Sequence, residues 1–410
     1  MLDKASSTRE NTWKRNFYIL WFAQIIAIIG FQSVQPFLSY YIQELNVEDL
    51  AEASIWAGYL GTMHGFAMAI SAPVWGVVAD RFGRKPMVVR AMVGGGVTVL
   101  LMAYVASVEQ LLAVRFLHGV LSGSVTASIT MVSTTTPRAQ LGFALGMMQS
   151  AFMFGAAIGA LGGGPAIDYF GYHTCFLVAG CLVVLGGILV QFGIEENFQR
   201  AAVQADGKSR FIDDARRVLR LKAFRVVLVC LTLIQFSFGV CTPVIPLFLQ
   251  ELAETDNIAS LAGLIFALSM LAGGASAAFM GKWSDRIGVQ KALVSGLVVT
   301  AFFFFAKGLS PTVQMLATLM ILSGLSSGVI RPLTSVLVTR IVAEEDRGKA
   351  FGVLTSANAL GWGLGPVIGG YIGAHFGFRL VFFITASLFL LAGLWVWRAM
   401  RGLDTGAAEG

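Results

Sequence analysis

The chain has 410 residues, of which 56% are hydrophobic and only 13% are charged. Soluble domains carry roughly a quarter of their residues as charged side chains, so this composition excludes an ordinary soluble protein. The charges form short clusters separated by apolar stretches of about 20 to 25 residues, the length that an α-helix needs to cross a bilayer.

These stretches predict an all-α integral membrane protein with twelve transmembrane helices. In chain order the spans cover residues 17–42, 54–79, 86–107, 110–134, 141–165, 173–194, 222–250, 258–283, 290–308, 312–335, 348–371 and 379–400. The first span follows a polar segment and is too long for the hydrophobic region of a signal peptide. No small-residue cleavage site follows it, so we expect no signal peptide.

Lysine and arginine are distributed unequally among the predicted loops. Most of the 29 lie in the even-numbered loops and the two ends of the chain, whereas the odd-numbered loops hold only Lys307 and Arg379. Cytoplasmic loops are rich in basic residues, so we expect both termini in the cytoplasm. The net charge of +6 then indicates contact with anionic lipid, and no nucleic-acid partner is expected.

The four cysteines, Cys175, Cys181, Cys230 and Cys241, all lie in predicted spans. None of them has the spacing of metal ligands, and buried thiols in apolar surroundings are usually inert. We therefore expect no disulfide, no bound metal and no cofactor.

The chain consists of two similar halves. Gly76-x3-Asp80-Arg81 recurs as Gly281-x3-Asp285-Arg286, and Gln43-Glu44-Leu45 recurs as Gln250-Glu251-Leu252 at a nearly constant offset. This predicts two six-helix bundles in pseudo-twofold relation, residues 1–194 and 222–410, an architecture typical of transporters. The linker, residues 195–221, has apolar residues at helical spacing, which favours an amphipathic helix on the cytoplasmic membrane surface over a plain solvated linker.

Three motifs are prominent. The first is the loop Gly76-Val77-Val78-Ala79-Asp80-Arg81-Phe82-Gly83-Arg84-Lys85 after span two. The second is Arg115-Phe116-Leu117-His118-Gly119-x3-Gly123 in span four. The third is Gly146-x8-Gly155-x3-Gly159-Ala160-x2-Gly163-Gly164 in span five, matched in span eleven by Gly352-x8-Gly361-x3-Gly365-Pro366-x2-Gly369-Gly370.

With these motifs the sequence resembles the major facilitator superfamily over essentially residues 13–401, and within it the drug:proton antiporter-1 family of bacterial multidrug exporters. Details around the first and last spans, Pro36-Phe37-Leu38 and Gly377-Phe378-Arg379, are similar to the MdtG-like branch of that family. The resemblance implies a proton-coupled transporter of the cell inner membrane that works by alternating access. We expect small-molecule substrates, protons and the lipid bilayer as partners, and a functional monomer.

The resemblance implies that the first motif is a gate that tethers the two halves in one state and releases them in the other. Its residues are Gly76, Asp80, Arg81, Gly83, Arg84 and Lys85, with Asp285 and Arg286 as a weaker second copy. Glycine at position 76 would allow a neighbouring helix to approach closely, and Asp80 can face the positive N-terminus of another helix. A plain turn with cytoplasmic basic residues is the alternative interpretation.

In the second motif the resemblance implies proton coupling for Arg115, near Gly119. An arginine inside the hydrocarbon must face protein or water, so we expect Arg115 to face the central cavity. His118 stands where the family commonly has glutamine. The third motif implies a hinge that distinguishes exporters, at Gly155, Gly159, Gly163, Gly361, Gly365 and Pro366. Ala160 replaces a family proline, which weakens the expectation of antiport, and generic helix packing is the alternative.

Polar and aromatic residues inside the spans are candidates for the substrate cavity, although each can also serve helix packing. They are Gln24, Gln32, Gln35, His64, Gln149, Phe152, Gln235, Phe236, Asn358 and Trp362. No aspartate or glutamate lies deep in any predicted span, which argues against a preference for cationic drugs. His64, His118 and Arg115 are therefore the candidates for linking proton and substrate movement.

Other functions are less consistent with the sequence. Gly324-Leu325-Ser326-Ser327-Gly328 matches the pattern of a hydrolase nucleophile, but that pattern requires a turn between a strand and a helix. The segment lies instead within a predicted helix, so we expect no enzyme activity. A non-transporting membrane sensor would normally carry a soluble signalling domain. A facilitator or proton-coupled importer of a small metabolite remains the alternative among transporters.

Overall fold

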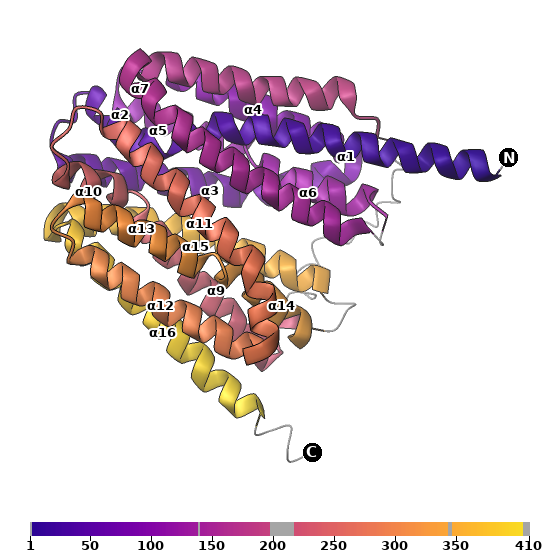
Figure 1. Ribbon diagram of the computed structural model, residues 1–410. Coiled ribbons are helices and arrows are strands. Elements are labelled where there is room, and N and C mark those ends of the chain that lie inside the picture. The colour runs from indigo at the N-terminus through magenta and orange to yellow at the C-terminus, as the bar shows by residue number, and fades with distance from the viewer. Residues whose placement is uncertain (1, 138–139, 197–216, 343–346, 405–410) are drawn as a thin grey trace. The chain divides into compact units, whose positions relative to one another are not determined.

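The computed structural model describes residues 2–137, 140–196, 217–342 and 347–404, which are helical with short connections and contain no strand (Figure 1). The helices of the first half are α1 (Leu2–Gln32), the 3-10 helix η1 (Gln35–Phe37), α2 (Leu38–Glu44), α3 (Leu50–Phe82), α4 (Lys85–Met102), α5 (Val108–Leu121), α6 (Ser124–Thr135) and α7 (Leu141–Gly193). Those of the second half are α9 (Lys222–Cys241), α10 (Val244–Leu252), α11 (Ile258–Ile287), α12 (Val289–Gly308), α13 (Val313–Ser327), α14 (Ile330–Ile341), α15 (Arg347–Phe376) and α16 (Phe378–Asp404).

The helices confirm the all-α membrane fold. Ten stretches of the described residues are long and apolar enough to cross a membrane. One of them, Leu141–Gly193, contains two of the predicted spans, and α15 covers the predicted span 348–371. The structure therefore accounts for all twelve predicted spans.

Several of the predicted spans are interrupted, a feature that hydrophobicity alone does not reveal. Span four is divided into α5 and α6 at Gly123, whose φ of 104° lies in the left-handed region that residues with a Cβ rarely adopt. Spans five and six follow one another within α7, where the chain kinks at Gly171, whose φ of 75° and ψ of 167° are not helical, so they form two helices as predicted.

Side-chain caps begin corresponding helices in the two halves. Ser107 accepts a hydrogen bond from the backbone N–H of Gln110 at the start of α5. Thr312 accepts one from Met315 at the start of α13. Such caps satisfy backbone groups that the first helical turn leaves unpaired, so the repeat extends to the signals that begin its helices.

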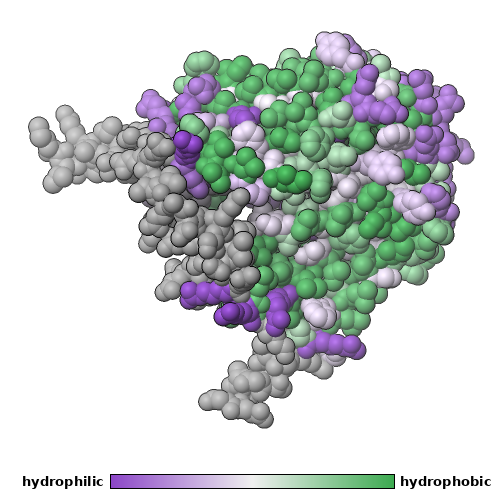
Figure 2. Space-filling model, turned by 180° about the vertical axis from the view of Figure 1, so that it is seen from behind, coloured by the Kyte–Doolittle hydropathy of each residue, from purple (hydrophilic) through white to green (hydrophobic). Residues whose placement is uncertain are grey.

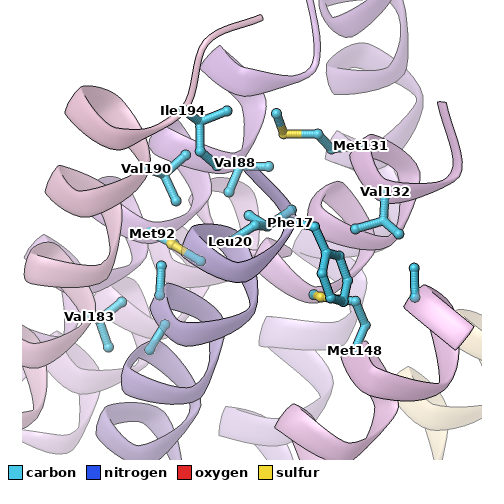
Figure 3. Packing of buried hydrophobic residues seen from close by; sticks show 13 residues of the cluster. Phe17, Leu20, Val88, Met92, Met131, Val132, Met148, Val183, Val190 and Ile194 are labelled. Carbon is cyan, nitrogen blue, oxygen red and sulfur yellow. The ribbon is translucent and has the colours of Figure 1, made fainter. Parts of the chain in front are cut away.

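The chain forms two compact units. The first contains Met1–Tyr41, Ala67–Val203 and Asp256–Ala267, and the second contains Ile42–Phe66, Gln204–Thr255 and Leu268–Gly410. Each unit therefore includes a short piece of the other half of the chain. A cluster of buried apolar side chains from α1, α4, α6 and α7 fills the first unit (Figure 3). Its members include Phe17, Leu20, Met92, Val183 and Val190.

An aromatic cluster lies in the core of the second unit. The ring of Phe389 in α16 lies 5.2 Å from those of Phe238 in α9 and Phe304 in α12, measured between centroids. Phe248 and Phe382 form another pair at 5.2 Å. Tilted and edge-on aromatic pairs stabilise a core beyond their buried area, so these rings hold α9, α12 and α16 together.

Lys307 is counted with an outer loop in the sequence, although it also lies at the end of the predicted span 290–308, and the structure places it in the helix. Lys307 lies in the last turn of α12, and only 2% of the residue is exposed. Its Nζ atom is 3.9 Å from the centroid of the Phe304 ring. The C-terminal carbonyl groups of a helix and the face of an aromatic ring both attract a cation, which explains how the bundle accommodates a buried lysine.

Large hydrophobic side chains cover much of the surface. In Figure 2 they occupy most of the visible face, and hydrophilic residues gather at its margins. The exposed side chains include Phe192 at 84%, Tyr169 at 80% and Val77 at 69%. Patches of this extent are rare on soluble monomers, and they indicate surfaces in contact with lipid. Most of the predicted linker helix, residues 197–216, lies outside the described residues.

Candidate functional site

The loop of the first motif makes a tight turn between α3 and α4. Gly83 supplies a φ of 102°, and Pro86 lies in the first turn of α4, where its missing N–H is tolerated. Across this turn the Arg84 guanidinium donates to Oδ1 of Asp80 at 2.8 Å. Both side chains are partly exposed, so the pair contributes little stability, and the tether between halves remains a prediction for Asp80.

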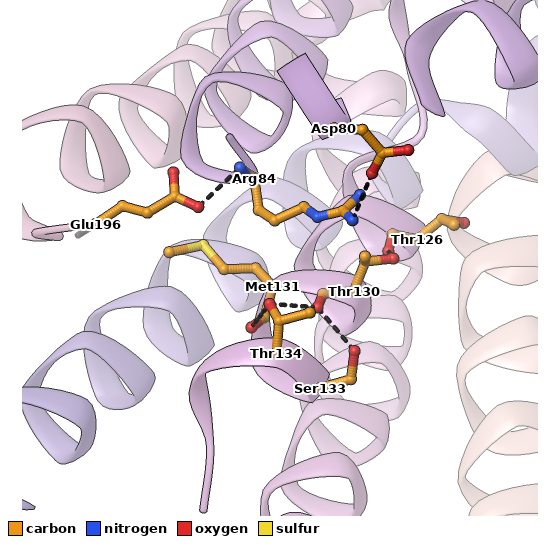
Figure 4. Close-up of polar contacts among 8 residues, drawn as sticks. All are labelled: Asp80, Arg84, Thr126, Thr130, Met131, Ser133, Thr134 and Glu196. Atoms are coloured by element: carbon orange, nitrogen blue, oxygen red, sulfur yellow. Dashed lines mark hydrogen bonds and ion pairs between the residues drawn. The ribbon is translucent and has the colours of Figure 1, made fainter. Parts of the chain in front are cut away.

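A carboxylate outside the motif also binds this loop. Glu196, just beyond the end of α7, accepts hydrogen bonds from the backbone N–H groups of Arg84 and Lys85, both at 2.8 Å. Asp80 and Glu196 therefore approach Arg84 from two sides (Figure 4). A carboxylate is favourable at a helix N-terminus because the unpaired N–H groups and the helix dipole both attract negative charge. Our sequence analysis assigned no role to Glu196, although an acidic residue after span six in a basic region was a usable signal.

Other residues of the gate contribute less in this structure. Gly76 is exposed, and a Cβ atom there would meet nothing within 4 Å. No described residue makes the expected close helix approach at this position, so the role of Gly76 remains a prediction. Arg81 is exposed near the ring of Phe82. In the second copy Arg286 is exposed in the last turn of α11, whereas the side chain of Asp285 lies outside the described part.

Arg115 is buried inside the first unit. Only 2% of it is exposed, and its Nη1 atom donates to Oε1 of Gln35 at 2.9 Å. Its Nε atom is buried and has no hydrogen-bond partner among the described residues. A buried charge is costly unless it is paired, and the partner here is a neutral amide. The site is therefore an electropositive point inside the bundle.

His118 lies one turn after Arg115 on the same side of α5. Its Nδ1 atom is 2.7 Å from the hydroxyl of Thr98, and that hydroxyl also lies 2.7 Å from the carbonyl oxygen of Gly95. A threonine hydroxyl has one proton, so when it donates to Gly95 the Nδ1–H of His118 donates to Thr98. The Phe31 ring packs edge-to-face with the imidazole, and the centroids of the two rings are 5.4 Å apart.

Gln24 has a structural environment. It is buried, and its amide nitrogen donates to the Ser124 hydroxyl at 3.4 Å while its oxygen accepts from Ser128 at 2.9 Å. These bonds join α1 to α6. Of the three glutamines on the first span, Gln24 therefore holds helices together, Gln35 reaches Arg115, and Gln32 packs with its Cβ atom against Gly159.

The break between α5 and α6 is held by two residues of neighbouring helices. The indole N–H of Trp75 in α3 donates to the carbonyl oxygen of Val120 at 2.7 Å, and Nη1 of Arg90 in α4 donates to the same oxygen at 3.4 Å. The Arg90 guanidinium stacks 3.9 Å from the centroid of the Trp75 ring. Together they satisfy the end of α5, next to Gly119 and the break.

The glycines of the third motif pack mainly within their own halves. A Cβ atom on Gly155 would lie 2.9 Å from side-chain atoms of Ile28, and one on Gly159 would lie 2.7 Å from the Ile29 carbonyl oxygen. Gly163 meets the backbone of Ser33 in the same way. In the second half Gly361 and Gly365 meet the backbone of α9, and Pro366 lies inside α15. The five glycines form two close helix contacts, α7 on α1 and α15 on α9, whereas Pro366 also lies against Gly58 and Gly61 of α3. The hinge remains a prediction.

The other cavity candidates are divided between the units. His64 and Trp362 are half-buried, and Gln235 is 8% exposed. The Oδ1 atom of Asn358 is buried, and no residue in the described part of the chain forms a hydrogen bond with it. Phe236 and Phe152 are half-buried, and Gln149 is exposed. Because a substrate cavity would depend on the placement of the two units, the role of these residues also remains a prediction.

Comparison with known proteins decides the family. The sequence profile of the Major Facilitator Superfamily matches residues 20–259 and 227–408. The chain belongs to this superfamily. The Multidrug resistance protein MdtG of Salmonella arizonae is 31% identical over 393 residues, covering 95% of this chain and 96% of that protein. MdtG of Proteus mirabilis is 30% identical over 398 residues, covering 96% and 98%.

Solved structures of the superfamily share the fold. A bacterial homolog of the human lysosomal transporter Spinster, in an inward-facing and unoccupied conformation, superposes with a TM-score of 0.76 at 14% identity and covers 95% of this chain and 97% of its own. The nucleoside transporter NupG superposes with a TM-score of 0.76 at 17% identity, and the match covers 94% of this chain and 99% of NupG.

As a Major Facilitator Superfamily protein, the chain is a membrane transporter and not an enzyme. The structure agrees for the hydrolase-like segment. Gly324 lies within α13 and packs against the backbone of Ser269 in α11, so the segment is a helix contact and not a nucleophile turn.

Proposed function

We propose that this transporter exports amphipathic small molecules in exchange for protons, with both termini in the cytoplasm. The observation that carries the proposal is the buried pair of Arg115 and Gln35, which places an uncompensated positive charge inside the first unit. The similarity to proteins named for multidrug resistance supports export, and the basic residues of the even-numbered loops support the orientation.

Arg115 and His118 have different chemical roles in this proposal. Arginine stays protonated in proteins, so Arg115 cannot itself carry the proton. His118 is the candidate because an imidazole can bind and release a proton, although its burial beside Arg115 opposes protonation in the present arrangement. A proton on His118 would place a second positive charge one helical turn from Arg115, and their repulsion is strong where water is excluded. Proton binding would thus favour a different arrangement of α5, and release would restore the present one.

The charge of the site also limits the substrate. No aspartate or glutamate lies deep in a predicted span, so the interior lacks the carboxylate that would attract a cation. Arg115 instead favours neutral or anionic molecules. We therefore expect the exported compounds to be neutral or anionic amphiphiles.

Proton movement in everted vesicles tests this function. An acid interior is established, neutral, anionic and cationic amphiphiles are added in turn, and lumenal pH is recorded for the wild type and Arg115→Ala. Collapse of the gradient by neutral or anionic compounds, absent in the variant at equal membrane content, is the expected result. No response to any compound would contradict proton antiport and favour a facilitator or an importer.

Orientation and oligomeric state have separate tests. A cysteine at Glu48 should react with an impermeant maleimide added to intact spheroplasts, whereas one at Arg84 should react only in everted vesicles. We also propose that the monomer is the functional unit, as the resemblance of the sequence implies. Mass measurement of the protein in nanodiscs would show one copy per active particle.

A further inference from the structure

A pair of glutamines joins the two halves of the chain through corresponding residues. Gln43 near the end of α2 donates to Oε1 of Gln250 at 2.8 Å, and Gln250 near the end of α10 donates to Oε1 of Gln43 at 2.9 Å. These residues belong to the repeated tripeptide Gln-Glu-Leu. The two glutamines occupy corresponding positions of the repeat, and each donates its amide to the other, as in a self-complementary interface. Both are partly exposed and lie in the second compact unit.

A second contact between the halves lies in the first compact unit. Asp168 in α7 accepts a hydrogen bond from the backbone N–H of Ser260, in the first turn of α11, at 2.7 Å. The carboxylate satisfies an N–H group that has no partner within its helix, and it faces the positive end of the helix dipole. One turn earlier in α7, Gly164 packs against the backbone of Ala259.

A third contact lies between α3 and α15 in the second unit. The Ser54 hydroxyl donates to the carbonyl oxygen of Gly370 at 3.0 Å, and the hydroxyl of Thr62 accepts from the N–H of Val367 at 3.0 Å. A Cβ atom on Gly58 would lie 2.7 Å from the Pro366 carbonyl oxygen. These three contacts involve parts of spans that the proposed orientation places toward the outside.

We infer that the Gln43–Gln250 pair and the Asp168–Ser260 contact form an outer lock, which must open before substrate leaves to the outside. The inference rests on the proposed export and orientation, because alternating access requires the two halves to separate on one side and then the other. Hydrogen bonds at partly exposed positions suit this task, since water replaces them at small net cost. The amide pair adds no net charge to the exit route.

Distance measurements test the lock without requiring transport. Spin labels are attached to cysteines at Glu48 and Glu254, both exposed, in protein whose four native cysteines are replaced by alanine. Gln43→Glu/Gln250→Glu replaces two hydrogen bonds by facing carboxylates. We expect the ratio of short to long distances in nanodiscs to fall about tenfold, equivalent to about 1.4 kcal/mol. Asp168→Asn keeps an acceptor but loses the charge, so a smaller fall of about threefold is expected.

Two variants show whether the effect is specific. Gln43→Glu/Gln250→Lys creates an ion pair at the same positions and should restore the short distance. Gln314→Glu makes the same chemical change at an exposed glutamine in α13 and should leave the distances unchanged. The lock is refuted if the spin-label distances in the double-glutamate variant and in Asp168→Asn are the same as in the wild type.

Cross-linking tests the consequence for transport. In Gln43→Cys/Gln250→Cys a short, cleavable bifunctional methanethiosulfonate should abolish export, and a reductant should restore it, while each single variant stays active. Full export by the cross-linked protein would refute the lock. The two proposals can fail separately. If the wild type shows no export but the spin-label distances of the variants still shift, the proposed export is refuted and the conformational role of these residues stands.

Discussion

Removing the carboxylate of Glu196 provides a quantitative test of how the gate loop is held. Glu196 accepts from two backbone N–H groups at the start of α4, both at 2.8 Å. Loss of such a cap costs about 0.5–2 kcal/mol, and loss of a charge at a helix N-terminus costs about 0.3–1 kcal/mol. Because Glu196 is half-buried, we expect Glu196→Ala to destabilise the first turn of α4 by roughly 1–2 kcal/mol.

Amide hydrogen exchange measures this effect directly. A loss of 1–2 kcal/mol raises the local opening equilibrium by roughly 5- to 30-fold, so the amides of Arg84 and Lys85 should exchange faster by that factor. Glu196→Gln keeps an acceptor oxygen but loses the charge, so it should show a smaller increase. The centre of α4 should be unaffected, because capping acts only on the first turn.

The neighbouring residue Glu195 is a matched control. Its carboxylate pairs with Arg15 at 2.9 Å, and the two side chains are 75% and 50% exposed. Exposed pairs contribute about 0–1 kcal/mol, so Glu195→Ala should leave exchange at Arg84 and Lys85 unchanged. Equal acceleration by both variants, or none by Glu196→Ala, would refute the capping role of Glu196.

Three further predictions concern the gate, the glycine contacts and the break in span four. Asp80→Asn should insert normally but transport more slowly in the vesicle assay, and unchanged transport would remove the gating role. Gly159→Ala should lower stability in detergent by about 1–3 kcal/mol because its Cβ meets the α1 backbone, whereas Gly162→Ala, with open space around it, should be neutral or up to about 1 kcal/mol more stable. Arg90→Gln should lower stability by about 1–2 kcal/mol through loss of the stacking on Trp75 and of the bond to the α5 terminus, and an unaltered melting temperature would contradict that role.

Much of the fold could be predicted because the bilayer imposes simple rules on sequence. A span must be apolar over a length set by the thickness of the bilayer, and each of the twelve spans meets this same requirement. The sequence could not show that Lys307, at the end of span nine, is buried against the ring of Phe304. It also could not show the break at Gly123 that divides span four into α5 and α6.

The candidate site was predicted only in part. The motifs named Arg115, His118 and Arg84, yet they did not indicate Gln35, Thr98 or Glu196 as their hydrogen-bond partners. Those partners come from other helices, and single glutamine, threonine or glutamate residues have no distinctive pattern in a sequence. Helix packing brings them together, and packing depends on side-chain volumes along the whole length of two helices.

The sequence by itself determined the membrane class, the spans, the repeat and the resemblance to a superfamily, since each is a local or periodic property of residue order. Only the tertiary structure decided which polar groups meet. Gln43 and Gln250 are far apart in the chain, and their shared position in the repeat did not require them to touch. Likewise, Asp168 could have faced lipid headgroups or water. Their contacts exist because long-range packing places two helix ends within hydrogen-bond distance, about 3 Å, a condition that no local pattern encodes.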